Sequence, residues 1–522
     1  MRQKKLLSLV LSLTLLLGVF FGLDMPAQAE DDQLVIGMAS DILSMDPYKF
    51  DEGPTNQFMR HIFQALVMID QDLVFQPLLA ESFEQSEDGL TWTFNLRKGV
   101  LFHDGSELTS KDVKASMELA NNPDSPSAFS IYTGAIKEIE TPDDYTVIFH
   151  LKAVDTIFLF ELSNVYILKA ENIVDKTEEE IADNPVGTGP YVFVEQVKED
   201  HIDLKYNEDY WGEEPEFKNV RFRPISNPAT RTATMLSGEI DFMMDVPVRD
   251  AERLANAEGI ELLTRQGLRE IYVNLDARPD SPHFPEGENP MANAKVREAM
   301  FLAIDRETII KNVMNGHAYL MNSIVPQGYV GEEDLDMPEY NPEKAKELLA
   351  EAGYPDGFEI TFDAPNDRYV NDAEIAQAVA AYWEKIGIKV NLNLMPKANF
   401  FKHISVRQEN TMALMTGWSD ASVDGISLLK DMVHTYDNEV NYGTVNRGHY
   451  SNPEVDKLIE EAMAEPDMEK RAELVKEANK LSAFEYPVLP LHYEEDSYAI
   501  KDTLDFTPTF DKMVYAWRFH KK

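Results

Sequence analysis

The stretch DAEIAQAVAAYWEKIGIKVNLNL, residues 372–394, contains a complete helix-then-strand unit. Apolar residues recur at helical spacing over 372–386, which predicts an amphipathic helix, and Gly387 is a typical helix stop. Apolar and polar residues then alternate over 388–394, which predicts a strand with one buried face. The helical stripe consists of Ile375, Val379, Tyr382 and Ile386.

Units of this kind recur along the chain. Thr109 and Asp112 have the spacing of a capping box, and Asn341 followed by Pro342 gives a cap residue and a first-turn proline. A pair of helices is expected over about 453–464 and 468–484, before an apolar strand. Alternating helices and strands predict an α/β fold.

A proline-rich segment, residues 276–291, separates a half rich in short strands from a half rich in helices. It contains four prolines and one glycine and shows no periodicity. We interpret it as an exposed boundary between two lobes, whose removal would matter little to folding. Ligand sites favour clefts between such lobes.

Residues 1–29 are predicted to be a cleaved signal peptide. A basic start is followed by an apolar run to about Gly22 and by Ala27-Gln28-Ala29, which favours cleavage before Glu30. A membrane anchor is the alternative, since the run is nearly long enough to span a bilayer. No Cys follows the run, so a lipoprotein is not expected, and the mature protein is predicted to be soluble and periplasmic.

The composition restricts the partners. With 92 acidic and 48 basic residues, the formal net charge is −44, which repels nucleic acid and anionic lipid. We interpret this charge as a solubility feature, of the kind that suits a salty habitat, with a cationic ligand as the alternative. The chain has no Cys, so it can form neither disulfides nor thiolate metal sites.

No motif of an enzyme is found. The eleven His residues are scattered, and the nucleophile, phosphate-loop and dinucleotide motifs are absent. His103 reads as a surface or structural residue in a turn. The glycine-rich residues 186–191 lack the Lys of a phosphate loop and predict a tight turn that brings backbone close to another segment. We therefore predict no catalytic residue, no metal and no cofactor.

The stretch LTWTFNLRKGVLFHDG, residues 90–105, resembles the signature of the family 5 extracellular solute-binding proteins. These are the dipeptide, oligopeptide, nickel and glutathione receptors of ABC importers. Further motifs of this family follow in order along nearly the whole chain. They are Asp46-Pro47, Gly187–Tyr191, Asn207 with Tyr210-Trp211, Gly238–Asp241, Val296–Ala299, Ala303–Arg306, Gly387–Val390, Gly417-Trp418 and Tyr450–Asp456.

The resemblance implies a two-lobed periplasmic-binding-protein fold of class II, in the large form, with the ligand between the lobes. Lobe I is expected over residues 30–285, with an inserted subdomain at about 73–189, and is completed by 488–522. Lobe II is expected over 286–487. Two chain crossings would permit hinge closure around the ligand. Most motif residues, such as the alternating Trp92, Phe94 and Leu96, are expected to be structural.

The resemblance also implies ligand-binding residues. Peptide-binding members carry an amine-pairing Asp three residues after the Trp of the Gly-Trp motif, where this chain has Ala421. Asp420 and Asp424 flank that position and are candidate substitutes. Trp418 is interpreted as a cleft wall, with a core position as the alternative.

A second set of candidates would hold the rest of the ligand. Arg368 resembles the Arg with which dipeptide receptors clamp a carboxylate, a geometry that the guanidinium fork matches, although a surface salt bridge is equally expected. Asn446 and Arg447 are weaker candidates, and Tyr191 is expected to line the cleft near the glycine turn.

These observations predict the binding component of an ABC importer for a short peptide or peptide-like solute. It would act as a monomer with a membrane permease as its partner. Glutathione, an oligosaccharide, an opine and, least favoured, a nickel chelate are alternative ligands. An exported peptide or glycoside hydrolase, and a chaperone-like or signalling receptor, are the alternatives from other classes.

Overall fold

The computed structural model describes residues 32–122, 127–174, 176–285, 288–404 and 411–522, so the expected signal peptide lies outside the described residues. One long mixed sheet runs through both halves of the molecule. Its strands, from one edge to the other, are β15 (Lys389–Met395), β14 (Glu359–Pro365), β16 (Ala413–Trp418), β12 (Ile260–Leu275), β17 (Leu489–Lys501), β11 (Phe242–Met244), β1 (Gln33–Met38), β10 (Asn219–Pro224), β9 (His201–Tyr206) and β8 (Tyr191–Val197), while β13 (Ala318–Leu320) pairs with β17.

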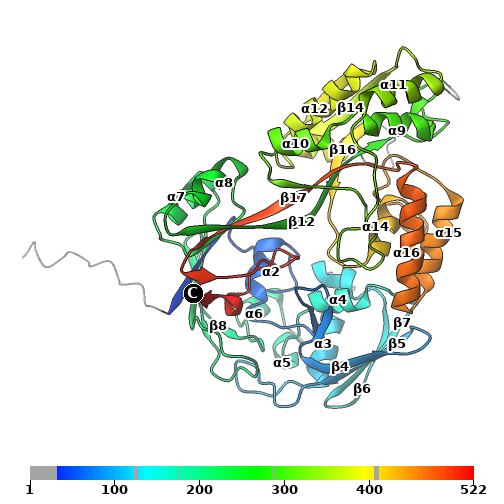
Figure 1. Ribbon diagram of the computed structural model, residues 1–522. Coiled ribbons are helices and arrows are strands. Elements are labelled where there is room, and N and C mark those ends of the chain that lie inside the picture. Colours follow the sequence, from blue (N-terminus) through cyan, green and yellow to red (C-terminus); the bar gives the residue numbers. More distant parts are fainter. Residues whose placement is uncertain (1–31, 123–126, 175, 286–287, 405–410) are drawn as a thin grey trace, which may run out of the picture.

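The two central strands join the two lobes. β12 and β17 are antiparallel and unusually long, and they lie side by side between the lobes in Figure 1. One end of this pair adjoins β11 in lobe I, and the other end adjoins β16 in lobe II. The register shifts between Gln266 and Glu270, which interrupts the regular pairing. A two-stranded connection of this kind permits the lobes to hinge.

A separate sheet lies within the range expected for the inserted subdomain. Its strands are β4 (Ala80–Gln85), β5 (Thr91–Leu96), β7 (Thr146–Leu151) and β6 (Ile136–Asp143). Along β5, buried and half-buried residues alternate, and Trp92, Phe94 and Leu96 face the core as expected. Phe94 packs edge-on against Phe149 of β7. The structural interpretation of this signature is therefore confirmed.

Helices cover both lobes. Those of lobe I are α2 (Gly53–Met59), α3 (Ser110–Ala120), α4 (Phe158–Asn164), α5 (Ala170–Ile173), α6 (Glu178–Ala182), α7 (Pro228–Leu236) and α8 (Val248–Ala255). Those of lobe II are α9 (Ala294–Leu302), α10 (Arg306–Asn312), α11 (Pro342–Glu351), α12 (Asp372–Lys385), α13 (Lys397–His403), α14 (Gly425–Met432), α15 (Pro453–Ala464) and α16 (Met468–Ala483). The remaining elements are the two-stranded pairs β2 (Val67–Ile69) with β3 (Phe75–Pro77) and β18 (Leu504–Asp505) with β19 (His520–Lys521), and the short 3-10 helices η1 (Ala128–Tyr132), η2 (Pro290–Ala292) and η3 (Ala516–Arg518).

Local signals position several of these elements. Thr109 and Asp112 form the predicted capping box of α3, and Asn341 caps α11 by accepting from the backbone N–H of Lys344. Gly387 has a φ of +97° directly after α12, as a helix stop requires. The strand β15 follows it and alternates between exposed and half-buried residues.

The proline-rich segment is not the exposed linker that the sequence suggests. Ser281, Asn289 and Met291 are buried. The Asn289 side chain donates to the carbonyl oxygens of Asp276 and Arg278 at 2.7 and 2.8 Å. Removal of the segment 276–291 would therefore expose packed surface of lobe II. We propose that the lobes divide within β12 and β17 rather than at residues 285 and 488.

The glycine turn before β8 brings two backbone segments into contact, which confirms that prediction. A Cβ atom on Gly189 would lie 2.4 Å from the carbonyl oxygen of His61 and 2.7 Å from that of Ile62. The His103 imidazole lies 3.0 Å from the carbonyl oxygen of Gly189, and the His103 backbone N–H donates to that of Gly187. His103 therefore holds the turn in place and is structural.

Substituting this turn tests how closely it is packed. We expect Gly189→Ala to reduce the free energy of unfolding by about 3 kcal/mol, because backbone atoms of residues 61–62 would have to move. Urea unfolding followed by tryptophan fluorescence measures the change. Gly134→Ala is the matched control, since a Cβ atom there makes only ordinary contacts at 3.7 and 4.0 Å. Equal stability of the two variants would contradict the close approach.

Candidate functional site

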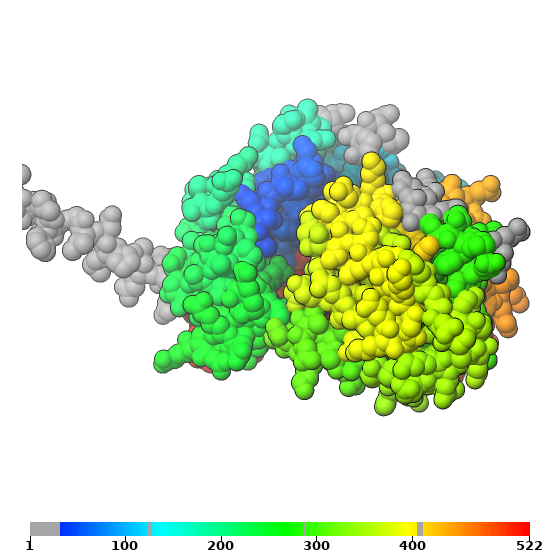
Figure 2. Space-filling model, turned by 90° about the horizontal axis from the view of Figure 1, so that it is seen from above, coloured from blue at the N-terminus to red at the C-terminus, as the bar shows by residue number. Residues whose placement is uncertain are grey.

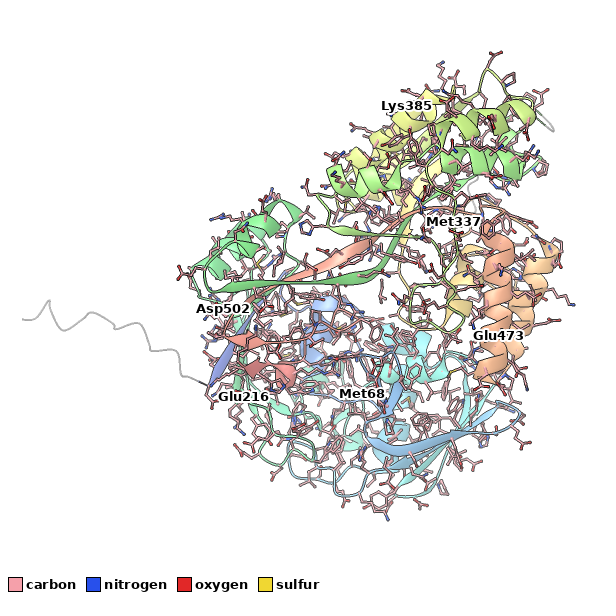
Figure 3. All side chains as sticks on the ribbon, viewed as in Figure 1. Met68, Glu216, Met337, Lys385, Glu473 and Asp502 are labelled. Carbon is pink, nitrogen blue, oxygen red and sulfur yellow. The ribbon has the colours of Figure 1, made fainter. Side chains whose placement is uncertain are left out.

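The molecule is hollowed between its lobes. Figure 2 shows a groove between the blue and green parts of lobe I and the part of lobe II that is coloured yellow, which the colour bar assigns to residue numbers around 400. Charged side chains lie on the outside of both lobes, as Glu216, Lys385, Glu473 and Asp502 show in Figure 3. Exposed acidic residues therefore lie on the outer surface of both lobes.

Arg368 lies between β14 and α12. Its backbone N–H donates to the Asp372 carboxylate at 2.8 Å, which fixes the turn that opens α12. Its side chain is exposed, and its guanidinium lies 5.1 Å from the centre of the Tyr369 ring. No ion pair joins it to another described residue, so the alternative surface salt bridge is not found there.

Neighbouring residues connect Arg368 to the strands that join the lobes. The Tyr369 hydroxyl donates to the carbonyl oxygen of Gly417 at 3.1 Å, next to Trp418. The backbone N–H of Val370 donates to the Glu494 carboxylate on β17 at 3.1 Å. Burial raises the pKa of Glu494 despite this hydrogen bond. This hydrogen bond therefore holds the loop that carries Arg368 next to β17.

Trp418 ends β16, directly opposite Glu270 of β12. It is half-buried and packs against the apolar cluster that includes Tyr493, so it has features of both predicted roles. Its indole N–H is buried and has no hydrogen-bond partner among the described residues. Asp420 follows in the next loop, and its two carboxylate oxygens accept from the Ser422 N–H and the Ser427 hydroxyl, each at 2.6 Å.

Asp424 is engaged inside the protein. Its carboxylate accepts from the Ile426 N–H at the start of α14 and forms a 3.0 Å ion pair with Arg471 of α16. Both side chains are buried, 4% and 6% exposed respectively. The predicted ligand role of Asp424 is corrected, because the carboxylate caps a helix and pairs within lobe II.

Two further candidates are core residues. Tyr191 is fully buried, and its hydroxyl donates to the carbonyl oxygen of Phe217 at 2.8 Å, so it does not line the groove. Asn446 is fully buried as well, and its amide donates to the carbonyl oxygens of His434 and Tyr450. Arg447 is half-buried beside Tyr272 of β12 and remains a weaker candidate.

The sequence interpretation missed Glu270. Its side chain is fully buried on β12, and neither carboxylate oxygen has a hydrogen-bond partner among the described residues. Burial, and then the charge of Asp420, raise the pKa of Glu270 well above its ordinary value. An acidic residue directly before the apolar run Ile271–Val273 is the signal that could have identified it.

Among the described residues, one group has the spacing of metal ligands. Glu195, His201 and Asp203 bring their ligand atoms within 4.8 Å of one another on the β8–β9 hairpin. Arg221 already binds both oxygens of Asp203, at 2.7 and 2.6 Å. The positive charge of Arg221 opposes a metal cation, so this group gives no support for a metal site.

The two lobes, the paired strands that join them and the groove between them define a class: two-lobed receptors for small solutes. A family model of the bacterial extracellular solute-binding proteins, family 5, matches residues 74–439. The glutathione-binding protein GsiB of Salmonella typhimurium is 28% identical over 478 residues, which cover 90% of each chain. This chain belongs to the family 5 extracellular solute-binding proteins.

Solved structures agree with this assignment. HbpA2 from Haemophilus parasuis superposes with a TM-score of 0.84 at 25% identity, covering 94% of this chain and 100% of the other. The periplasmic binding protein DppA from Helicobacter pylori, solved with the peptide STSA, superposes with a TM-score of 0.71 at 27% identity, covering 94% and 98%. The predicted family, the two-lobed α/β fold and the solute-binding role are thereby confirmed.

Proposed function

We propose that this chain captures a short peptide or peptide-like solute and delivers it to the permease of an ABC importer. The observation that carries the proposal is the likeness to solute-binding proteins over nearly the whole chain. Arg368 supports a peptide-like ligand, because an exposed guanidinium that has no ion-pair partner among the described residues is available to a carboxylate. Closure of the lobes about β12 and β17 would exclude water from the bound solute.

The remaining features of the proposal concern the setting. The chain is exported through its first 29 residues, acts as a monomer in the periplasm, and binds its solute without chemical change, metal or cofactor. The family description as extracellular supports export. In the described part of the chain, no helix is both long and apolar enough to span a membrane.

Glutathione is the alternative ligand that a specific observation favours. Glutathione-binding proteins are among the relatives, at 28% identity over most of the chain. Glutathione is itself a peptide-like solute, so the receptor role is the same for both ligands.

Native mass spectrometry of the purified mature protein tests the receptor role. We expect a complex of one chain with one small molecule, and extraction under denaturing conditions then identifies that molecule. If the protein is empty, a thermal-shift screen of di- and tripeptides, glutathione, opines and oligosaccharides follows. Absence of binding throughout, or turnover of a bound peptide, would overturn the proposal.

The role of Arg368 is tested with the solute identified in this way. We expect Arg368→Ala to weaken binding by about 1–3 kcal/mol, because a carboxylate in a closed cleft would lose its charged partner. Isothermal titration calorimetry measures the loss. Arg249→Ala is the matched control, since Arg249 is an exposed arginine of α8 in lobe I. An unchanged dissociation constant would reject the clamp.

A further inference from the structure

Glu270 is an anomaly in the packing of the two lobes. Its carboxylate has 0% exposure, and both of its oxygens lack a hydrogen-bond partner among the described residues. Removing a carboxylate from water without a compensating partner is costly, and buried polar groups in folded proteins are nearly always paired. A Gln or Leu at this position would be less costly, so stability does not explain the residue.

The surroundings of Glu270 make its position less favourable still. The charged group whose field reaches it is Asp420, which has the same sign. Its strand neighbours are Trp418 on β16 and Tyr493 on β17. The Tyr493 hydroxyl donates instead to the carbonyl oxygen of Ser323, and that of Tyr329 donates to the carbonyl oxygen of Asp420.

Trp418, next to Glu270, indicates which kind of group could pair with this carboxylate. Its indole N–H is buried and unpartnered beside the unpartnered carboxylate, so the two groups do not satisfy each other. A carboxylate, a second carboxylate nearby and aromatic rings form a set that favours a cation, through ion pairing and through the faces of the rings. Both oxygens of Asp420 already accept hydrogen bonds, which leaves Glu270 as the direct acceptor.

We propose that Glu270 receives a positively charged group of the bound solute, so that the protein selects solutes that carry an ammonium or guanidinium group. This inference rests on the proposed function, because it concerns the same site. The cation would approach past Trp418 at the end of β16 and take the place of the missing hydrogen-bond donors. Asp420 would stabilise it through its field and Trp418 through its ring.

The proposal predicts that solute binding changes the protonation of Glu270. Burial and the field of Asp420 raise the pKa of the Glu270 carboxyl well above its ordinary value, and the facing groups are Asp420 and the hydroxyls of Tyr272, Tyr329 and Tyr493. A cation in contact with Glu270 would favour its ionised form, so binding would release a proton. Affinity is then expected to rise, by up to about tenfold per pH unit, while free Glu270 remains protonated.

Pairs of solutes that differ in one charge test the proposal. Trialanine and glutathione are each compared with their N-acetylated forms, and any extracted solute is included. We expect the wild-type protein to prefer the free amine at least tenfold. Glu270→Gln should lose that preference, whereas Glu473→Gln, which changes an exposed residue of α16, should keep it.

Calorimetry of the wild-type protein gives a second measurement that needs no variant. Binding enthalpies in phosphate and in Tris differ by the heat of buffer protonation if a proton is released, and we expect such a difference. Equal affinity of wild type and Glu270→Gln for the free amines, no proton release, or an extracted solute without a cationic group would each overturn the proposal and leave the receptor role standing. Failure to bind any solute would instead overturn the receptor role, and the proposal with it.

Discussion

Replacing Arg471 by alanine is expected to lower the free energy of unfolding by about 3–5 kcal/mol, because it leaves a buried carboxylate without its partner. The Arg471 side chain lies 3.0 Å from the Asp424 carboxylate, and neither side chain is more than 6% exposed. Even beside this cation, burial raises the pKa of Asp424. The ion pair joins α14 to α16, so its loss would loosen the packing of lobe II.

Urea unfolding at pH 7 measures this effect. Lys470→Ala is the matched control, because Lys470 is the preceding residue of α16 and is largely exposed. The double variant Asp424→Asn with Arg471→Met should recover much of the stability, since the Asn side chain can still cap α14 and no charge remains buried. A loss of less than about 1 kcal/mol for Arg471→Ala would show that water screens the pair.

This pair also explains one failure of the sequence interpretation. Asp424 lies within seven residues of the Gly-Trp motif, which made it a candidate ligand residue, but its partner is 47 residues away in the sequence. The predicted ligand roles of Tyr191 and Asn446 failed because both side chains are buried, which only the tertiary structure defines. A polar residue in a motif is compatible with a core position as well as with a ligand.

Features that depend on neighbouring residues could be predicted. The capping box of α3, the cap of α11 and the α12–β15 unit follow from spacing and from residue type within a few positions. The boundary that we propose between the lobes could not, because it falls within the long strands β12 and β17, where no composition change marks it. Glu270 was missed because its environment is formed by strands that lie far apart in the sequence.

Glu161 is expected to make stability depend on pH. Burial, and then the charge of the neighbouring Asp155, raise the pKa of Glu161 to about 9, while Lys430 from α14 lowers it. The folded state therefore keeps this proton to a higher pH than the unfolded chain does. Its stabilising contribution is fully present below the ordinary carboxyl pKa and is lost as the pH rises through about 9. Between pH 5 and 7.5 the loss is about 3 kcal/mol.

Glu161→Gln isolates this contribution, because an amide cannot ionise. We expect the difference in unfolding free energy between the variant and the wild type to grow by about 3 kcal/mol in favour of the variant from pH 5 to 7.5. Glu171→Gln is the control, since Glu171 is 82% exposed on the neighbouring α5. A cavity of about 330 Å³ is lined by Glu161 and Asp155 on one side and by Lys430 of α14 on the other. A constant difference across this range would contradict the raised pKa of Glu161.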